Sequence, residues 1–164
     1  MTEPGEYRVR PATEADAAAI AEIWHAGWRE AHLGAVSDEL IQYRTEESFG
    51  VRALENVSLT SVAEVAGKVA GFVTVWKNEV EQVYLATEHR GGGIATALLR
   101  EGERLVAANG HTTAWLAVIG PNTRARRFYA RSGWVDDGPF EHLAPGGHIV
   151  AAHRYSRTLP DPPS

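Results

Sequence analysis

The chain of 164 residues contains no cysteine and a single methionine. The lack of cysteine excludes disulfide bonds, thiolate metal sites and any mechanism that forms a covalent intermediate on a cysteine. The sequence also lacks a long apolar run: no stretch approaches the roughly 18 residues of a membrane-spanning helix, and no early segment resembles a signal peptide. We therefore expect a cytoplasmic protein that acts without a membrane.

Positive charge is scarce as well. The 16 Lys and Arg residues are outnumbered by 21 Asp and Glu residues, which gives a formal net charge of −5. The basic residues are scattered apart from one group of arginines between positions 124 and 131. Because a nucleic-acid surface needs a broad basic patch, we expect no nucleic-acid partner. With 44% apolar residues, the chain is long enough for one domain with a sizeable core.

The spacing of the apolar residues predicts elements in the order β, α, α, β, β, β, α, β, α, β, β. Helical spacing is found from Thr13 to about Gly34, over 37–54 with a break near Thr45, over 93–109, and from 123 to 133. Strand patterns cover 7–12, 59–67, 68–76, 78–86, 112–119, 134–137 and 148–156, and the last two flank a loop that contains Pro145, Gly146 and Gly147. This order predicts an α/β fold, a mixed sheet with helices on its faces. The predicted domain covers 7–157, between a flexible start (1–6) and a disordered tail (158–164).

Three consecutive glycines, Gly91, Gly92 and Gly93, lie between a predicted strand and the start of a long helix. A helix N-terminus leaves backbone N–H groups unpaired and therefore binds anions, and glycines let the anion approach the main chain. The run does not match a Walker A loop, because no lysine follows it, or a Rossmann fingerprint, because Thr96 stands at the third glycine position. A different anion-binding loop and a plain turn are the readings left.

Two segments resemble motifs of the GCN5-related N-acetyltransferase (GNAT) family. The first, Arg90-Gly91-Gly92-Gly93-Ile94-Ala95, resembles the loop that binds the pyrophosphate of acetyl-CoA. The second resembles Asn-x-x-Ala-x-x-Phe-Tyr followed by Gly and an aromatic, here Asn122, Ala125, Phe128, Tyr129, Gly133 and Trp134. The resemblance covers about residues 7–157. It implies a single-domain GNAT-like fold with a mixed, mostly antiparallel central sheet, and direct transfer of an acetyl group from acetyl-CoA to a primary amine of a small molecule or peptide.

The resemblance also implies where acetyl-CoA binds. Its pantetheine arm would pair with the open edge of a strand at Val83, Tyr84 and Leu85. Its pyrophosphate would lie on the backbone amides of the loop, at Gly91, Gly92, Gly93, Ile94, Ala95 and Thr96. Arg90 would either face the phosphates or be a solvated loop residue. Asn122 would hydrogen-bond to the cofactor, cap the helix that begins near Thr123, or do both.

An amine acceptor with a lysine-like pKa of about 10 must lose a proton before it attacks the thioester. Glu79 and Glu81 are two residues apart on the predicted strand, so we expect them to share one face with Val83 and Leu85. Either is a candidate base, directly or through water, with Glu81 preferred; the other reading is a pair of exposed charges at a strand end. The N–H of Leu85 would stabilise the oxyanion. Tyr129 matches the tyrosine that protonates the leaving thiolate in family members, or is a core residue beside Phe128.

The resemblance places the acceptor groove against the first helix, where Trp28, Glu30 and His32 are candidates for binding the acceptor. Core packing explains the tryptophans equally well. His25 and His32 are seven residues apart without carboxylates at matching spacing, so we expect no metal site. Many family members pair through their late strands, which makes a homodimer one expected arrangement. The alternative to an enzyme is a non-catalytic module that binds or senses acyl-CoA, and the sequence leaves the acceptor and the acyl chain length open.

Overall fold

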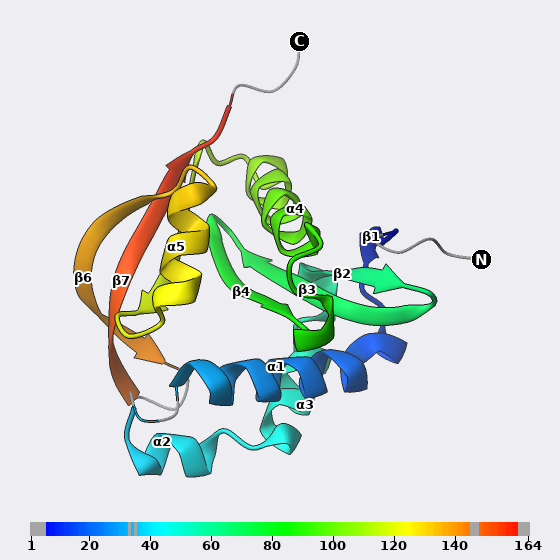
Figure 1. The fold of residues 1–164 in the computed structure, drawn as a ribbon, viewed down its shortest axis with the longest axis horizontal. Helices are drawn as coiled ribbons and strands as arrows, with labels where there is room; N and C mark the ends of the chain where they lie inside the picture. The colour runs from blue at the N-terminus through cyan, green and yellow to red at the C-terminus, as the bar shows by residue number, and fades with distance from the viewer. Residues whose placement is uncertain (1–5, 33, 35, 145–147, 161–164) are drawn as a thin grey trace.

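The computed structural model describes residues 6–32, 34, 36–144 and 148–160, which form a seven-stranded sheet with helices on both faces (Figure 1). The strands lie in the order β1-β2-β3-β4-β5-β7-β6, and all neighbours are antiparallel except β4 and β5. The strands are β1 Arg8–Pro11, β2 Thr60–Val65, β3 Lys68–Trp76, β4 Glu79–Leu85, β5 Thr113–Ile119, β6 Val135–Ala144 and β7 His148–Thr158. The predicted fold class, a mixed and mostly antiparallel sheet flanked by helices, is confirmed.

The helices also follow the predicted order. They are α1 Ala17–His32, α2 Asp38–Tyr43, α3 Glu46–Glu55, α4 Ile94–Ala108 and α5 Thr123–Arg131. The predicted break near Thr45 separates α2 from α3, because the hydroxyl of Thr45 accepts a hydrogen bond from the N–H of Ser48 (3.1 Å) and begins a new helix. In the part of the chain that is described, every helix is too short or too polar to cross a membrane.

Two hydrophobic clusters hold the helices on opposite faces of the sheet. The helices α1 and α3 pack on one face, where Phe72 of β3 meets Trp24 and Phe49. The helices α4 and α5 cover the other face, where Val73 of β3 meets Leu98. A Cβ on Gly27 of α1 would lie 2.4 Å from the ring of Tyr84 on β4. Gly27 is therefore the residue that lets α1 approach β4 closely.

The prediction for the end of the chain is wrong in two places. The strand predicted to end at 137 continues as β6 to Ala144, paired along its length with β7, and Gly138 (φ +107°) makes a bulge where the sequence resembles a turn. The disordered tail predicted from 158 is wrong for its first residues, because Thr158 ends β7 and Leu159 is buried against the core. Three predicted segments lie wholly or partly outside the described residues: the loop at 145–147, the flexible start at 1–5, and the tail from 161 on.

The sheet opens between β4 and β5. Glu79 and Trp115 are the one residue pair that joins these strands, next to a hydrogen bond from the N–H of Trp115 to the carbonyl of Asn78 (3.0 Å). Just after the end of β4, the N–H of Ala86 donates a hydrogen bond to the carbonyl of Ala70 in β3 (2.8 Å). Because alternate N–H groups of a strand point to opposite neighbours, the N–H of Leu85 points into the opening.

Candidate active site

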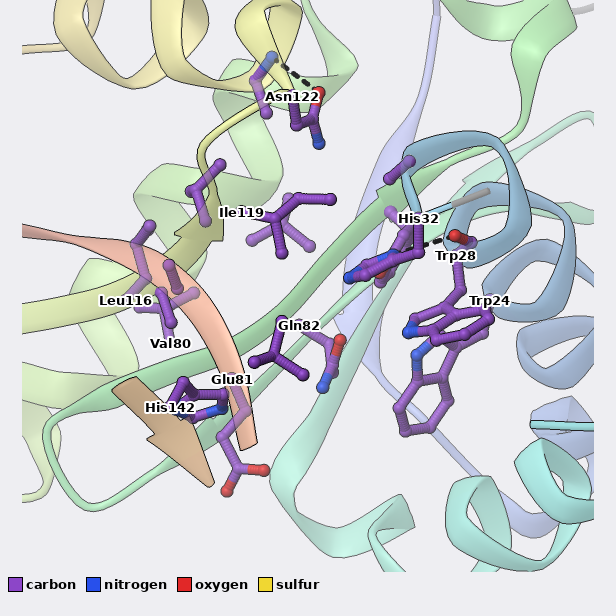
Figure 2. A pocket seen from close by; sticks show the side chains of 18 of the residues that line it. Trp24, Trp28, His32, Val80, Glu81, Gln82, Leu116, Ile119, Asn122 and His142 are labelled. Carbon is purple, nitrogen blue, oxygen red and sulfur yellow. Dashed lines mark hydrogen bonds between the residues drawn. The ribbon is translucent and has the colours of Figure 1, made fainter. Parts of the chain in front are cut away.

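Two cavities meet in the opening between β4 and β5. The loop cavity, about 380 Å³, lies beside the glycine run and is lined by Arg90, Gly91, Gly93, Ala95, Thr96 and Arg124, among others. The aromatic cavity, about 170 Å³, is lined by residues that include Trp24, Trp28, His32, Arg52, Glu79 and His142 (Figure 2). The residues that line both are Ala31, Val83, Tyr84, Asn122, Ala125 and Tyr129. The two cavities therefore adjoin at Tyr129, and their linings differ in chemistry.

The glycine run turns the chain from β4 into α4. Gly91 and Gly93 have φ values of +85° and +86°, and a Cβ on either would meet no protein atom within 4 Å. These glycines are therefore needed for backbone conformation and not for packing. Gly93 is the N-cap of α4 and offers no side chain to the first N–H groups of the helix, so they are free to bind an anion.

The predicted cofactor residues divide into two groups. Val83, Tyr84, Leu85 and Asn122 line the loop cavity together with the loop residues named above. Gly92 and Ile94 are not among its lining residues, and the Ile94 side chain is buried in the core, 3% exposed. These two residues can reach a ligand in the cavity only with backbone groups, whereas Ile94 fixes the first turn of α4.

Glu30 has a different place from the one expected. It was predicted to bind the acceptor, but its carboxylate lies outside the aromatic cavity and pairs with Arg90 (2.8 Å) and Arg124 (2.8 Å) beside the glycine run. Hydrogen bonds from Arg90 and then Arg124 lower the pKa of Glu30 to about 2, although burial opposes the shift. Glu30 therefore stays ionised at neutral pH and joins α1 to the loop and to α5.

A β-bulge changes the face on which the two glutamates lie. Thr74 of β3 is opposite Gln82 and Val75 is opposite Val80, which leaves Glu81 as an extra residue on β4. The expected face shared by Glu79, Glu81, Val83 and Leu85 is therefore wrong. Instead Val80 and Val83 face the α4 side, while Glu79 lies on the same face as Tyr84, toward α1.

Both glutamates nevertheless line the aromatic cavity. Burial raises the pKa of Glu79 to about 7; the charge of Glu81 adds to the effect and that of Arg154 opposes it. Burial also raises the pKa of Glu81, and the charge of Arg52 opposes that shift. Figure 2 shows Glu81 next to His142, at the opposite end of the cavity from Asn122. A carboxylate with a pKa near neutrality is suited to accept a proton at physiological pH.

His32 and Trp28 are two of the α1 residues that line the aromatic cavity. Their rings are stacked with centroids 4.5 Å apart, and His32 Nδ1 lies 2.8 Å from the carbonyl oxygen of Trp28. Because a carbonyl only accepts hydrogen bonds, Nδ1 carries the proton of the neutral ring and Nε2 is an acceptor. Burial lowers the pKa of His32, which favours this neutral form, and the ring points into the cavity (Figure 2).

Tyr129 and Asn122 lie where the two cavities join. The Tyr129 side chain is 8% exposed, and burial raises the pKa of its phenol, so it keeps its proton at neutral pH. The ring also packs 5.3 Å from that of Phe128, so Tyr129 is both a core residue and part of the lining of the two cavities. Asn122 Oδ1 accepts a hydrogen bond from the N–H of Ala125 (3.3 Å) and caps α5. Its amide nitrogen is left to donate elsewhere (Figure 2).

Sequence reasoning missed three ionisable residues of the aromatic cavity: Arg44, Arg52 and His142. They come from the end of α2, from α3 and from β6, and no motif connects them, so only the fold brings them together. Among the described residues, no group of three or more His, Asp or Glu side chains is arranged to hold a metal ion.

Comparison with known proteins places the chain among acetyltransferases. The model of the acetyltransferase (GNAT) family matches residues 17–134. An uncharacterized N-acetyltransferase of Mycobacterium tuberculosis is 31% identical over 77 residues, which cover 44% of this chain and 49% of that protein. The match thus spans about half the length of the curated relatives.

Solved structures match over nearly the whole chain. The PaiA N-acetyltransferase of Thermoplasma acidophilum in complex with coenzyme A has a TM-score of 0.74 at 19% identity, covering 94% of this chain and 99% of that one. YncA, a putative acetyltransferase of Salmonella typhimurium with its cofactor acetyl-CoA, has a TM-score of 0.71 at 19% identity, covering 97% of each chain. At these identities, the two structures establish a shared fold.

Proposed function

Since the chain belongs to the GNAT acetyltransferase family, we propose that it moves the acetyl group of acetyl-CoA directly to a primary amine of a small molecule or peptide. The observation that carries this proposal is the pair of cavities that meet at Tyr129. One ends at a helix N-terminus suited to phosphate and the other at two partly buried carboxylates, so a donor and an acceptor can enter from opposite sides.

The residues of the loop cavity fit acetyl-CoA. The positive φ of Gly91 and Gly93 turns the chain into α4, whose first N–H groups have no capping side chain and can bind a pyrophosphate. Arg90 and Arg124 add positive charge beside them. From Val83 to Leu85 the edge of β4 does not pair with β5, so its backbone groups are available to the amide groups of a pantetheine arm. When bound, acetyl-CoA supplies the thioester.

We assign the proton transfers to groups on either side of the junction. Glu79 or Glu81 takes a proton from the acceptor ammonium, and the pKa of about 7 makes Glu79 the better matched base. The N–H of Leu85, which points into the opening, stabilises the negative charge on the carbonyl oxygen. Tyr129 keeps its proton at neutral pH, so its phenol can donate that proton to the leaving thiolate.

The test is a panel of primary amines incubated with acetyl-CoA while the release of free thiol is followed. Turnover with at least one amine, lost in Tyr129→Phe, supports the proposal. Binding of acetyl-CoA without turnover of any amine would instead favour a non-catalytic acyl-CoA-binding module. A panel that pairs acetyl-CoA with longer acyl-CoA donors also measures the acyl chain preference.

A further inference from the structure

Arg52 of α3 lies in the wall of the aromatic cavity without an anionic partner. Its guanidinium carbon is 4.4 Å from the ring centroid of Trp24 and 5.8 Å from that of Phe49. Among the residues that the structure describes, none makes an ion pair or a hydrogen bond with the guanidinium of Arg52. Stacking on Trp24 holds the planar guanidinium in place while its N–H donors stay unused.

The surroundings of Arg52 make an anion favourable there. Burial, followed by the charge of Arg44, lowers the pKa of Arg52 to about 10. Arg44 is itself 4% exposed and lines the same cavity. A desolvated cation next to a second cation is costly unless a negative group comes within hydrogen-bond distance. This end of the cavity therefore selects for an anion.

The same cavity also contains the two carboxylates of β4. Glu81 and Arg52 are near enough to shift each other's pKa, yet they form no ion pair, so there is space between them. The cavity volume of about 170 Å³ is close to that of the roughly 150 Å³ cavity that holds one benzene molecule. An occupant of this cavity is thus small and carries positive and negative charge a few bonds apart.

We propose that the acceptor is a small free α-amino acid whose carboxylate binds Arg52 while its amine faces Glu79 and Glu81. The two oxygens of a carboxylate match the guanidinium fork, and the side chain of the amino acid would lie against apolar residues such as Leu116 and Ile119. This inference rests on the proposed function. A peptide N-terminus lacks a carboxylate next to its amine and is therefore a poor fit.

The reaction balances with the groups present. It forms a bond between the amine nitrogen and the acetyl carbon and breaks the bond from that carbon to sulfur. The ammonium loses two protons in all: one is matched by the proton that the thiolate gains through Tyr129, and the other passes through the glutamates to solvent.

The experiment compares matched acceptors with acetyl-CoA: L-alanine with ethylamine, L-valine with isobutylamine, and L-leucine with both isopentylamine and L-leucinamide. Leucinamide is less basic than leucine and isopentylamine is more basic, so a preference for leucine over both does not come from amine basicity. We expect kcat/KM for the amino acids to exceed that for the matched amines by about 10- to 100-fold, as for a hydrogen-bonded charge pair. Amines without a carboxylate that react equally well would overturn the inference.

Arg52→Met removes the charge and keeps an unbranched side chain on Trp24. Arg52→Lys keeps the charge without the two-pronged guanidinium. Arg29→Met, at an exposed position of α1, is the matched control. We expect Arg52→Met to lose the preference for amino acids over the matched amines, Arg52→Lys to fall between, and the control to match the wild type. A preference that survives in a folded Arg52→Met variant refutes the assignment.

Calorimetric binding of L-leucine and isopentylamine to the protein saturated with coenzyme A separates this inference from the proposed function. Leucine binding that is lost in Arg52→Met supports the carboxylate site even if no amine turns over, in which case the transferase proposal alone fails. Equal binding of leucine and isopentylamine overturns the carboxylate site and leaves the transferase proposal intact.

Discussion

Replacing Glu79 by Gln should stabilise the protein and impair its activity at the same time. Burial raises the pKa of Glu79 from 4.5 to about 7, so the folded state disfavours the ionised form. Stability is therefore lost as the pH rises from about 4.5 to about 7, and the loss is complete above that range. At 1.36 kcal/mol for each pKa unit, the cost reaches about 3 kcal/mol in alkaline solution.

Urea unfolding of the wild type and Glu79→Gln at pH 5 and pH 8 measures this cost. We expect the variant to be more stable by up to about 3 kcal/mol at pH 8 and by less than about 1 kcal/mol at pH 5. Glu22→Gln, on the exposed side of α1, serves as a control and should change stability equally at both pH values. Equal unfolding midpoints of Glu79→Gln and the wild type at pH 8 would show that the carboxylate is not destabilised in the fold.

The same variant tests the role of Glu79 as the base. If Glu79 accepts the proton, the wild-type kcat/KM rises with pH through about 7, and this rise is lost in Glu79→Gln. A rise that persists in Glu79→Gln and disappears in Glu81→Gln would assign the base to Glu81.

Three further predictions concern Tyr129 at the junction of the two cavities and the residues beside the glycine run. Tyr129→Phe should lower kcat by roughly 10²-fold or more with little change in the affinity for acetyl-CoA, as single-turnover and binding measurements can separate; an unchanged kcat across pH would remove Tyr129 from the mechanism. Gly93→Val, at φ +86°, should raise the KM for acetyl-CoA far more than it lowers the unfolding midpoint, whereas equal losses would make the segment an ordinary turn. Glu30→Gln should release Arg90 and Arg124 from their ion pairs and so tighten the binding of coenzyme A a few-fold at low salt. The gain in affinity should decrease as salt is added. Weaker binding would show instead that Glu30 positions these arginines.

The order of the elements could be predicted because local signals agreed with the fold. The caps at Thr45 and Gly93 and the β-branched run from Lys68 to Trp76 each act within a few residues, and no tertiary contact overrides them. The segment around Gly138 misled because Asp-Asp-Gly-Pro is typical of a turn. In the structure the same residues make a bulge on an edge strand, where proline at position 139 costs no ladder hydrogen bond.

The candidate site was less predictable than the fold. The glycine run and Tyr129 lie in contiguous sequence motifs, so their place in the candidate site could be predicted from the sequence. The face of the sheet on which Glu79 lies could not be predicted, because the alternation of side chains along β4 is interrupted by the extra residue Glu81. Arg52 and His142 reach the aromatic cavity from elements far apart in the chain, and the pairing of Glu30 with Arg90 depends on the distance between α1 and the loop.

The single residue pair between β4 and β5 has a mechanical consequence. It divides the sheet into a half made of β1 to β4 and a half made of β5 to β7, with few backbone hydrogen bonds across the seam. A ligand that pairs with the free edge of β4 acts as a missing strand and couples the two halves. Amide hydrogen exchange at Val83 and Leu85 should therefore slow when coenzyme A binds, and the halves should unfold more cooperatively with the ligand than without it.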